Sequence, residues 1–167
     1  MKKLNEQSVL KPLQIYFLLC VYILLILCTR EASAQMTGTY TISKSGGNYT
    51  TLGAAITDLN AQGISGPVIF NITADQTFDE PTPVSITATG TNTNTITFRR
   101  SGSGYNPIFN FTGTAGTDDY AIQLFGSDYV TFDGIEIRDA GTSSDNYIEY
   151  GFYFLTSYNL DGCQNNT

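Results

Sequence analysis

Apolar and polar residues alternate with a period of two along most of this chain, which is the pattern of half-buried β-strands. The densest example is the stretch YAIQLFGSDYVTFDGIEIRD at 120–139, which holds three short strand patterns. Gly126-Ser127-Asp128 and Asp133-Gly134 stand between them, and these are residue types that tight turns favour. Strands this short, joined by turns this tight, indicate part of one coil of a β-solenoid.

One segment departs from the strand pattern. Residues 51–62 (TLGAAITDLNAQ) carry apolar side chains at helical spacing, at Leu52, Ala55, Ile56 and Leu59, and Gly63 follows at the position of a helix C-cap. The remaining strand patterns lie at 37–43, 68–72, 84–86, 95–98, 108–111 and 152–154. We therefore expect a single amphipathic helix near the front, where it would cover one end of the coil.

Apolar pairs recur at intervals that suit a solenoid. The pairs Phe70/Ile72, Ile96/Phe98, Ile122/Leu124 and Phe152/Phe154 are separated by 26, 26 and 30 residues. The last two pairs share flanking Tyr and Ser residues, in 120–127 and 150–157. A β-sandwich also has short strands at regular spacing, but the lone helix and the short turns favour an all-β, right-handed parallel β-helix. Asn71, Asn110 and Asn159 are expected to point inward at its turns and bond their neighbours in the next coil.

The first 34 residues form the pattern of a secretory signal peptide. Lys2, Lys3 and Lys11 precede a fourteen-residue apolar run at 15–28, and Ala32-Ser33-Ala34 is a small-x-small cleavage site before Gln35. A membrane anchor is the alternative, but about 20 apolar residues are needed to cross a bilayer. The sequence thus predicts cleavage between Ala34 and Gln35 and a secreted or cell-surface mature chain, 35–167, that is not held in the membrane.

Removal of this segment changes the charge and the candidate chemistry. Four basic residues remain against thirteen acidic ones, a net charge of −9, so nucleic acid is not an expected partner. Cys163 is then the single cysteine, which leaves no intrachain disulfide. The chain has no histidine, which excludes Ser-His-Asp catalysis and His-ligated zinc sites within it.

The order of leading strand, helix TLGAAITDLNAQG, strand GPVIFNI and coils such as SDYVTFDGIEIRD resembles the N-terminal part of secreted right-handed parallel β-helix proteins of the pectate-lyase-like superfamily. It is especially similar to forms common in surface and secreted proteins of Bacteroidetes. The resemblance implies the fold and leaves the activity open, since that superfamily includes polysaccharide lyases, glycoside hydrolases and non-catalytic surface proteins. Such helices usually have more coils, so we expect the chain to be an N-terminal fragment.

Candidate metal and catalytic residues are few. Asp118 and Asp119 are adjacent carboxylates that suit Ca²⁺ or acid–base chemistry, although such residues also occur as ordinary solvated turn residues. Asp133, Glu136 and Asp139 allow the same two interpretations, with Glu136 expected to point outward. No other cofactor is expected. The superfamily's hydrolases use a Gly-His-Gly motif and its lyases an Arg or Lys base; the first is missing, and Arg99, Arg100 and Arg138 have no evident carboxylate-binding partners in the sequence.

Aromatic residues give the stronger functional indication. Tyr147, Tyr150, Tyr153 and Tyr158 gather near the end of the chain, and the alternation of Tyr153 with Phe152 and Phe154 requires some rings to face outward. Exposed tyrosine rings cover the apolar face of a sugar at small entropic cost; packing under the loop at 140–146 is the alternative. We predict a non-catalytic module that binds polysaccharide or a cell-surface glycan, or supports adhesion. The alternative is the front part of a polysaccharide lyase or glycoside hydrolase with its active coils beyond Thr167.

Overall fold

The structure is a computed structural model that describes residues 15–22, 34–80, 83–114, 119–157 and 161–167. The chain divides into two units, Met1–Ser33 and Ala34–Thr167. In the first, residues 15–22 form the short helix α1. No helix within the described ranges has both the length and the apolar character needed to span a membrane.

The second unit is a parallel β-solenoid with one further helix, α2 (Leu52–Gln62). Its strands are β1 (Met36–Ile42), β2 (Ile64–Thr73), β3 (Thr77–Glu80), β4 (Val84–Ile86), β5 (Ile96–Ser101), β6 (Ile108–Phe111), β7 (Tyr120–Phe125), β8 (Val130–Asp133), β9 (Glu136–Asp139) and β10 (Tyr150–Leu155). All pairings between them are parallel. The predicted parallel β-helix architecture is therefore confirmed.

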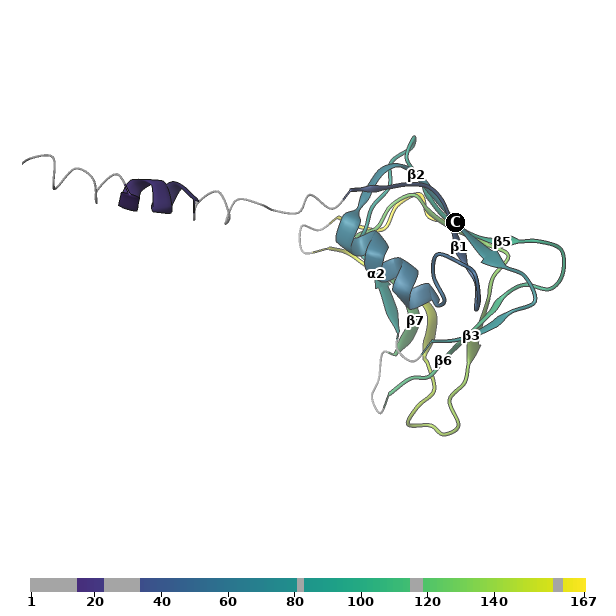
Figure 1. Cartoon of the computed structure of the whole chain (residues 1–167). Coiled ribbons are helices and arrows are strands. Elements are labelled where there is room, and N and C mark those ends of the chain that lie inside the picture. The colour runs from purple at the N-terminus through teal and green to yellow at the C-terminus, as the bar shows by residue number, and fades with distance from the viewer. Residues whose placement is uncertain (1–14, 23–33, 81–82, 115–118, 158–160) are drawn as a thin grey trace, which may run out of the picture. The chain divides into compact units, whose positions relative to one another are not determined.

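Three sheets form the sides of the coil (Figure 1). Sheet A has the order β1-β2-β5-β8, sheet B has β3-β6-β9, and sheet C has β4-β7-β10. The chain visits A, B and C in turn three times, so each successive coil adds one strand to every sheet. Residues 164–167 then return to sheet A, where the N–H of Thr167 donates to the carbonyl of Val130 at 3.0 Å and its carbonyl accepts from Phe132 at 2.8 Å.

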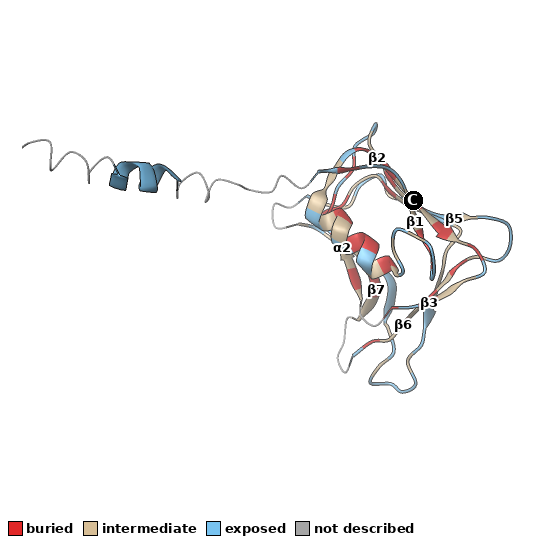
Figure 2. Ribbon diagram, viewed as in Figure 1, coloured by how far each residue is buried: buried red, intermediate tan, exposed pale blue. Residues whose placement is uncertain are grey.

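The buried residues lie on the strands and the helix that surround the interior of the coil (Figure 2). Core side chains on neighbouring strands are stacked in register. On sheet A, Tyr40, Phe70, Phe98 and Phe132 form one column through all four strands. The ring centroids of Phe70 and Phe98 are 4.6 Å apart, and those of Phe98 and Phe132 are 5.0 Å apart. Phe78 and Phe109 stack in the same way on sheet B, at 5.0 Å. Each fully buried ring contributes about 1.5–3 kcal/mol of transfer free energy.

Helix α2 covers the interior at the end of the coil that holds β1, β3 and β4 (Figure 1). The apolar residues that the periodicity predicts for the core are all buried. Thr51 caps the N-terminus by accepting the N–H of Ala54 at 3.1 Å, and Gly63, with φ 64°, ends the helix by donating to the carbonyl of Leu59 at 2.8 Å. Both the helix and its C-cap residue are as predicted.

The side chain of Asn60 fastens α2 to the edge of sheet C. Its Oδ1 accepts the N–H groups of Thr87 at 2.9 Å and Ala88 at 3.1 Å, and its Nδ2 donates to the carbonyl of Ser85 at 2.7 Å. We expect Asn60→Ala to lower the free energy of unfolding by about 1–3 kcal/mol, because these backbone groups lose their partner. Urea unfolding measures the change. Thr57→Ala, which removes only a bond within the helix, is the control, and an equal loss in both variants would contradict the role of Asn60.

Three details of the sequence interpretation are wrong. Phe70 pairs with Phe98 rather than with Ile96, and the pairs Ile96/Phe98 and Ile122/Leu124 lie on different sheets, A and C. Every coil contains three apolar strands, so spacing alone does not reveal which strands are equivalent. Asn71 and Asn110 lie within strands and face outward, where they contact Arg99 and Asp79; Asn159 lies outside the described residues. Strand β3 was not predicted.

Candidate functional site

Three tyrosine rings form a cluster at one end of β7 and β10. Tyr150 pairs with Tyr120 across the two strands, and Tyr153 pairs with Gln123. The ring of Tyr153 lies between the other two, with centroids 5.1 Å from Tyr150 and 5.8 Å from Tyr120, and both pairs are stacked. Tyr150 remains 40% exposed. We call Tyr120, Tyr150 and Tyr153 the tyrosine cluster.

Polar side chains continue from the tyrosine cluster across the outer face of sheet C. Ser85, Gln123 and Tyr153 occupy the same register position on three successive strands. The hydroxyl of Ser85 donates to Oε1 of Gln123 at 2.8 Å. Because alternate residues of a strand face opposite sides, this column points away from the core residues Ile122 and Leu124. Tyr153 therefore lies on the outer face of sheet C, and its stacking joins this polar column to the rings of Tyr120 and Tyr150 at the start of β7 and β10.

The four predicted tyrosines do not act as one group. Tyr150 and Tyr153 meet in the tyrosine cluster, whereas Tyr158 lies outside the described residues. Tyr147 is 47% exposed, and its ring lies against Gly141, where a Cβ would approach the ring to 2.7 Å. Tyr147 thus contacts the loop at 140–146. Tyr120 belongs to the cluster but is not among the predicted residues, although its match to Tyr150 in the repeat is a signal for it.

Asp119, the described member of the predicted acidic pair, bonds Thr114 and the start of β10. Asp119 accepts the N–H of Thr114 at 2.5 Å and its hydroxyl at 3.1 Å, and its main-chain carbonyl accepts the N–H of Tyr150 at 3.0 Å. Asp118 lies outside the described residues. Within the described ranges, no group of three or more His, Cys, Asp or Glu residues is placed to hold a metal ion. Asp119 therefore helps to position the start of β10, and with it Tyr150.

The remaining predicted positions are not brought together. Glu136 faces outward, as expected, and bonds Arg138 at 2.6 Å between Oε1 and Nε. Arg99 donates to Oδ1 of Asn71 at 2.9 Å, and Arg100 donates to the carbonyl of Gly104 at 2.8 Å. Gln35 and Ala34 lie at the start of the second unit and are exposed. The arginines thus lie on the outer surface, away from the tyrosine cluster.

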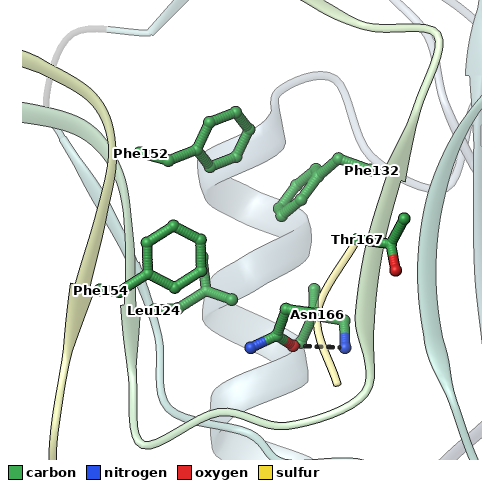
Figure 3. A pocket seen from close by; sticks show the side chains of 7 residues that line it. Leu124, Phe132, Phe152, Phe154, Asn166 and Thr167 are labelled. Atoms are coloured by element: carbon green, nitrogen blue, oxygen red, sulfur yellow. Dashed lines mark hydrogen bonds between the residues drawn. The ribbon is translucent and has the colours of Figure 1, made fainter. Parts of the chain in front are cut away.

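An apolar cavity lies at the end of the coil opposite α2. Its volume is about 190 Å³, and it is lined by Leu124, Val130, Phe132, Phe152, Phe154, Asn166 and Thr167. Figure 3 shows the rings of Phe132, Phe152 and Phe154 around it. Asn166 lies across one side, where its Oδ1 accepts the N–H of Val130 at 2.8 Å. This cavity continues the stacked core and offers few polar groups, so it differs in chemistry from the outer face of sheet C.

Comparison with protein-family models, with curated proteins and with solved structures finds no match to this chain. Among the surfaces of the described residues, the tyrosine cluster with its neighbouring Gln123 and Ser85 has the composition best suited to a specific ligand.

Proposed function

We propose that this chain is a secreted or cell-surface β-solenoid module that binds polysaccharide, without catalysis, on the outer face of sheet C. The observation that carries the proposal is the stacked tyrosine cluster beside a column of polar side chains. A saccharide ring has an apolar face that an aromatic ring can cover, and hydroxyl groups at its rim that amides and hydroxyls can bond. Here an aromatic ring and an amide, those of Tyr153 and Gln123, lie at paired positions on neighbouring strands.

The rigidity of the site supports the same proposal. Ring stacking fixes Tyr153 between its two neighbours, and the carbonyl of Asp119 fixes the backbone of Tyr150. Side chains that are ordered before binding lose little conformational entropy when the ligand arrives. Repetition of strands along the coil also favours an extended, repetitive ligand such as a polysaccharide over a small compact one.

The signal-peptide pattern in residues 1–34 supports the extracellular location that this function needs. The arrangement of strand, helix α2 and parallel coils supports an evolutionary relationship to the pectate-lyase-like superfamily, as the sequence resemblance implies. Determination of the N-terminal residue of the protein recovered from the medium tests the first, with Gln35 as the expected residue.

Replacement of Tyr153 by alanine tests the binding site. We expect at least a tenfold loss of affinity, equivalent to about 1.4 kcal/mol, for polysaccharides that the protein retains on a glycan array and in pull-down assays. Tyr153 is the central ring, so its loss removes both stacked pairs. Tyr147→Ala is the matched control, because it removes an exposed tyrosine away from the cluster and should leave affinity unchanged.

Two results would count against this function. Absence of retention on every neutral, uronate and sulfated polysaccharide of the array would contradict polysaccharide binding altogether. Equal affinity of the Tyr153→Ala variant and the unmodified protein would exclude the tyrosine cluster as the site. Circular dichroism of each variant shows whether the fold is retained.

A further inference from the structure

A groove lies at the corner between sheets A and B, on the outside of the coil. Its volume is about 320 Å³, and its lining is Asp75, Thr77, Tyr105, Asn106, Ile108, Glu136 and Arg138. These residues come from three successive coils: the corner before β3, the loop before β6, and strand β9. The groove is separate from the tyrosine cluster, which lies on sheet C.

The loop at 102–107 forms one wall of the groove and is held in place by the preceding coil. The N–H of Tyr105 donates to Oδ1 of Asp75 at 2.8 Å, and the N–H of Asp75 donates to the carbonyl of Tyr105 at 3.1 Å. Gly104 has a φ of 125°, and a Cβ there would collide with the carboxylate of Asp75. Glycine is therefore required for the loop to approach Asp75 this closely.

This fixed loop presents an aromatic ring to solvent. Tyr105 is 85% exposed. Among the described residues, it makes no stacking contact with another ring. An exposed ring on a rigid backbone is preorganised to stack on a ligand.

A guanidinium–carboxylate pair lies in the same groove. Nε of Arg138 is 2.6 Å from Oε1 of Glu136, and both side chains are about half exposed. A guanidinium has five N–H donors and a carboxylate about four acceptor positions, so the pair retains donors and acceptors side by side after bonding each other. Two neighbouring hydroxyls of a sugar, each both donor and acceptor, match this arrangement.

The charged side chains in and beside the groove disfavour an acidic ligand. Asp75 and Glu136 line the groove, and Asp79 lies beside it, in the same outward column as Asn110 and Arg138. Arg138 and the nearby Arg100, which bonds Gly104 of the loop, are the opposing cations. A uronate or sulfate group would meet more carboxylates than cations here.

We propose that this groove is a second binding site, which takes a neutral saccharide unit with vicinal hydroxyls. Tyr105 covers the apolar face of the sugar ring, the pair Arg138–Glu136 bonds two adjacent hydroxyls, and Asn106 lies within the same lining. The site is independent of the tyrosine cluster, so a single polysaccharide chain or two different chains can engage both faces of the coil.

The test is a ¹H–¹⁵N NMR titration of the protein with neutral cello-, manno- and xylohexaose, and with hexagalacturonate as the acidic comparison. We expect one of the neutral hexaoses to shift the amide signals of residues 100–106 and 136–138. Tyr105→Ala and Arg138→Met should each weaken that binding at least tenfold. Tyr147→Ala, which removes an exposed tyrosine that belongs neither to the groove nor to the tyrosine cluster, should leave it within twofold.

The site is overturned if no neutral hexaose shifts these amides, if hexagalacturonate binds the groove more tightly than all three neutral ligands, or if Tyr105→Ala leaves the affinity unchanged. Amide signals of residues 120–125 and 150–155 report on sheet C in the same spectra. Failure of this site and failure of the function proposed for the tyrosine cluster are therefore distinguished residue by residue. Unchanged signals elsewhere in the spectra of the variants show that they are folded.

Discussion

Replacement of Phe98 by alanine is expected to lower the free energy of unfolding by about 3–5 kcal/mol. Phe98 is fully buried and is stacked between Phe70 and Phe132 on neighbouring strands. Its loss removes two stacked ring contacts and leaves a cavity that the strand backbones on either side prevent from closing. Because total stability is commonly 5–15 kcal/mol, this single change should remove a large fraction of it.

Urea unfolding followed by circular dichroism measures this effect. Phe154→Ala is the matched control, since it removes the same ring from β10 at a position that is 54% exposed, where we expect a loss of about 1 kcal/mol. Similar losses in the two variants would mean that the aromatic column on sheet A does not stabilise the coil more than any other ring.

Replacement of Glu80 by leucine has the second largest expected effect, about 2–4 kcal/mol, because it leaves the buried N–H of Leu52 and the partly buried N–H of Gly53 unpaired. Glu80 is 3% exposed and lies at the end of β3. Its two carboxylate oxygens accept the N–H of Leu52 at 2.6 Å and that of Gly53 at 3.1 Å, at the first turn of α2. The side chain thus caps a helix some 28 residues earlier in the chain. Glu80→Gln keeps one oxygen acceptor, so its expected loss is smaller, and equal losses would contradict the capping role.

The same group predicts a pH dependence. Burial raises the pKa of Glu80 above its ordinary value of 4.5, and the bonds from Leu52 and Gly53 offset only part of this effect. The folded state then binds the proton more tightly than the unfolded state. The contribution of Glu80 to stability is therefore full below about pH 4.5 and is lost as the pH rises through the raised pKa.

Unfolding free energies measured from pH 4 to pH 7 test this dependence. We expect the decline with rising pH to be smaller in Glu80→Gln than in the unmodified protein. Asp145→Asn, which removes an exposed carboxylate in the loop before β10, should retain the decline. An identical pH dependence in all three proteins would contradict the assignment to Glu80.

Local patterns allowed most of the elements to be predicted. The alternation in 84–86 and 108–111 matches β4 and β6 residue for residue, and the helical spacing of Leu52, Ala55, Ile56 and Leu59 matches the buried face of α2. In these segments the residues that face the core are apolar and their neighbours are polar. The spacing of the apolar residues therefore shows which side chains of these segments are buried.

Strand β3 cannot be recognised from the spacing of apolar residues. Its sequence, TFDE, contains two acidic residues, and one of the two inward positions is occupied by Glu80 rather than by an apolar side chain. Glu80 is tolerated inside only because α2 supplies two N–H donors from a distant part of the chain. No local pattern encodes that partner, so the strand could not be predicted from its own residues.

The candidate sites were predictable only in part, for a related reason. The alternation around Tyr153 indicated an outward ring, but the stacking of Tyr153 between Tyr120 and Tyr150 depends on the register of β7 and β10. The groove with Tyr105 depends on residues from three coils, between which the loops differ in length. To predict a site that is assembled from several coils, one must know which residues pair between neighbouring strands. That register is set only when the chain folds.

Because of helix α2, the two ends of the solenoid differ in how readily a further strand can pair with them. At its end of the coil, the helix closes the interior, and the Asn60 side chain occupies backbone groups that another strand would need. At the opposite end, β9 and β10 each pair with one strand within the described residues, and residues 164–167 lie beside β8. On sheet C, Asn60 therefore obstructs the addition of a strand beside β4, whereas the outer edge of β10 has no such obstruction among the described residues. For this sheet, one-sided addition favours closed pairs over open filaments.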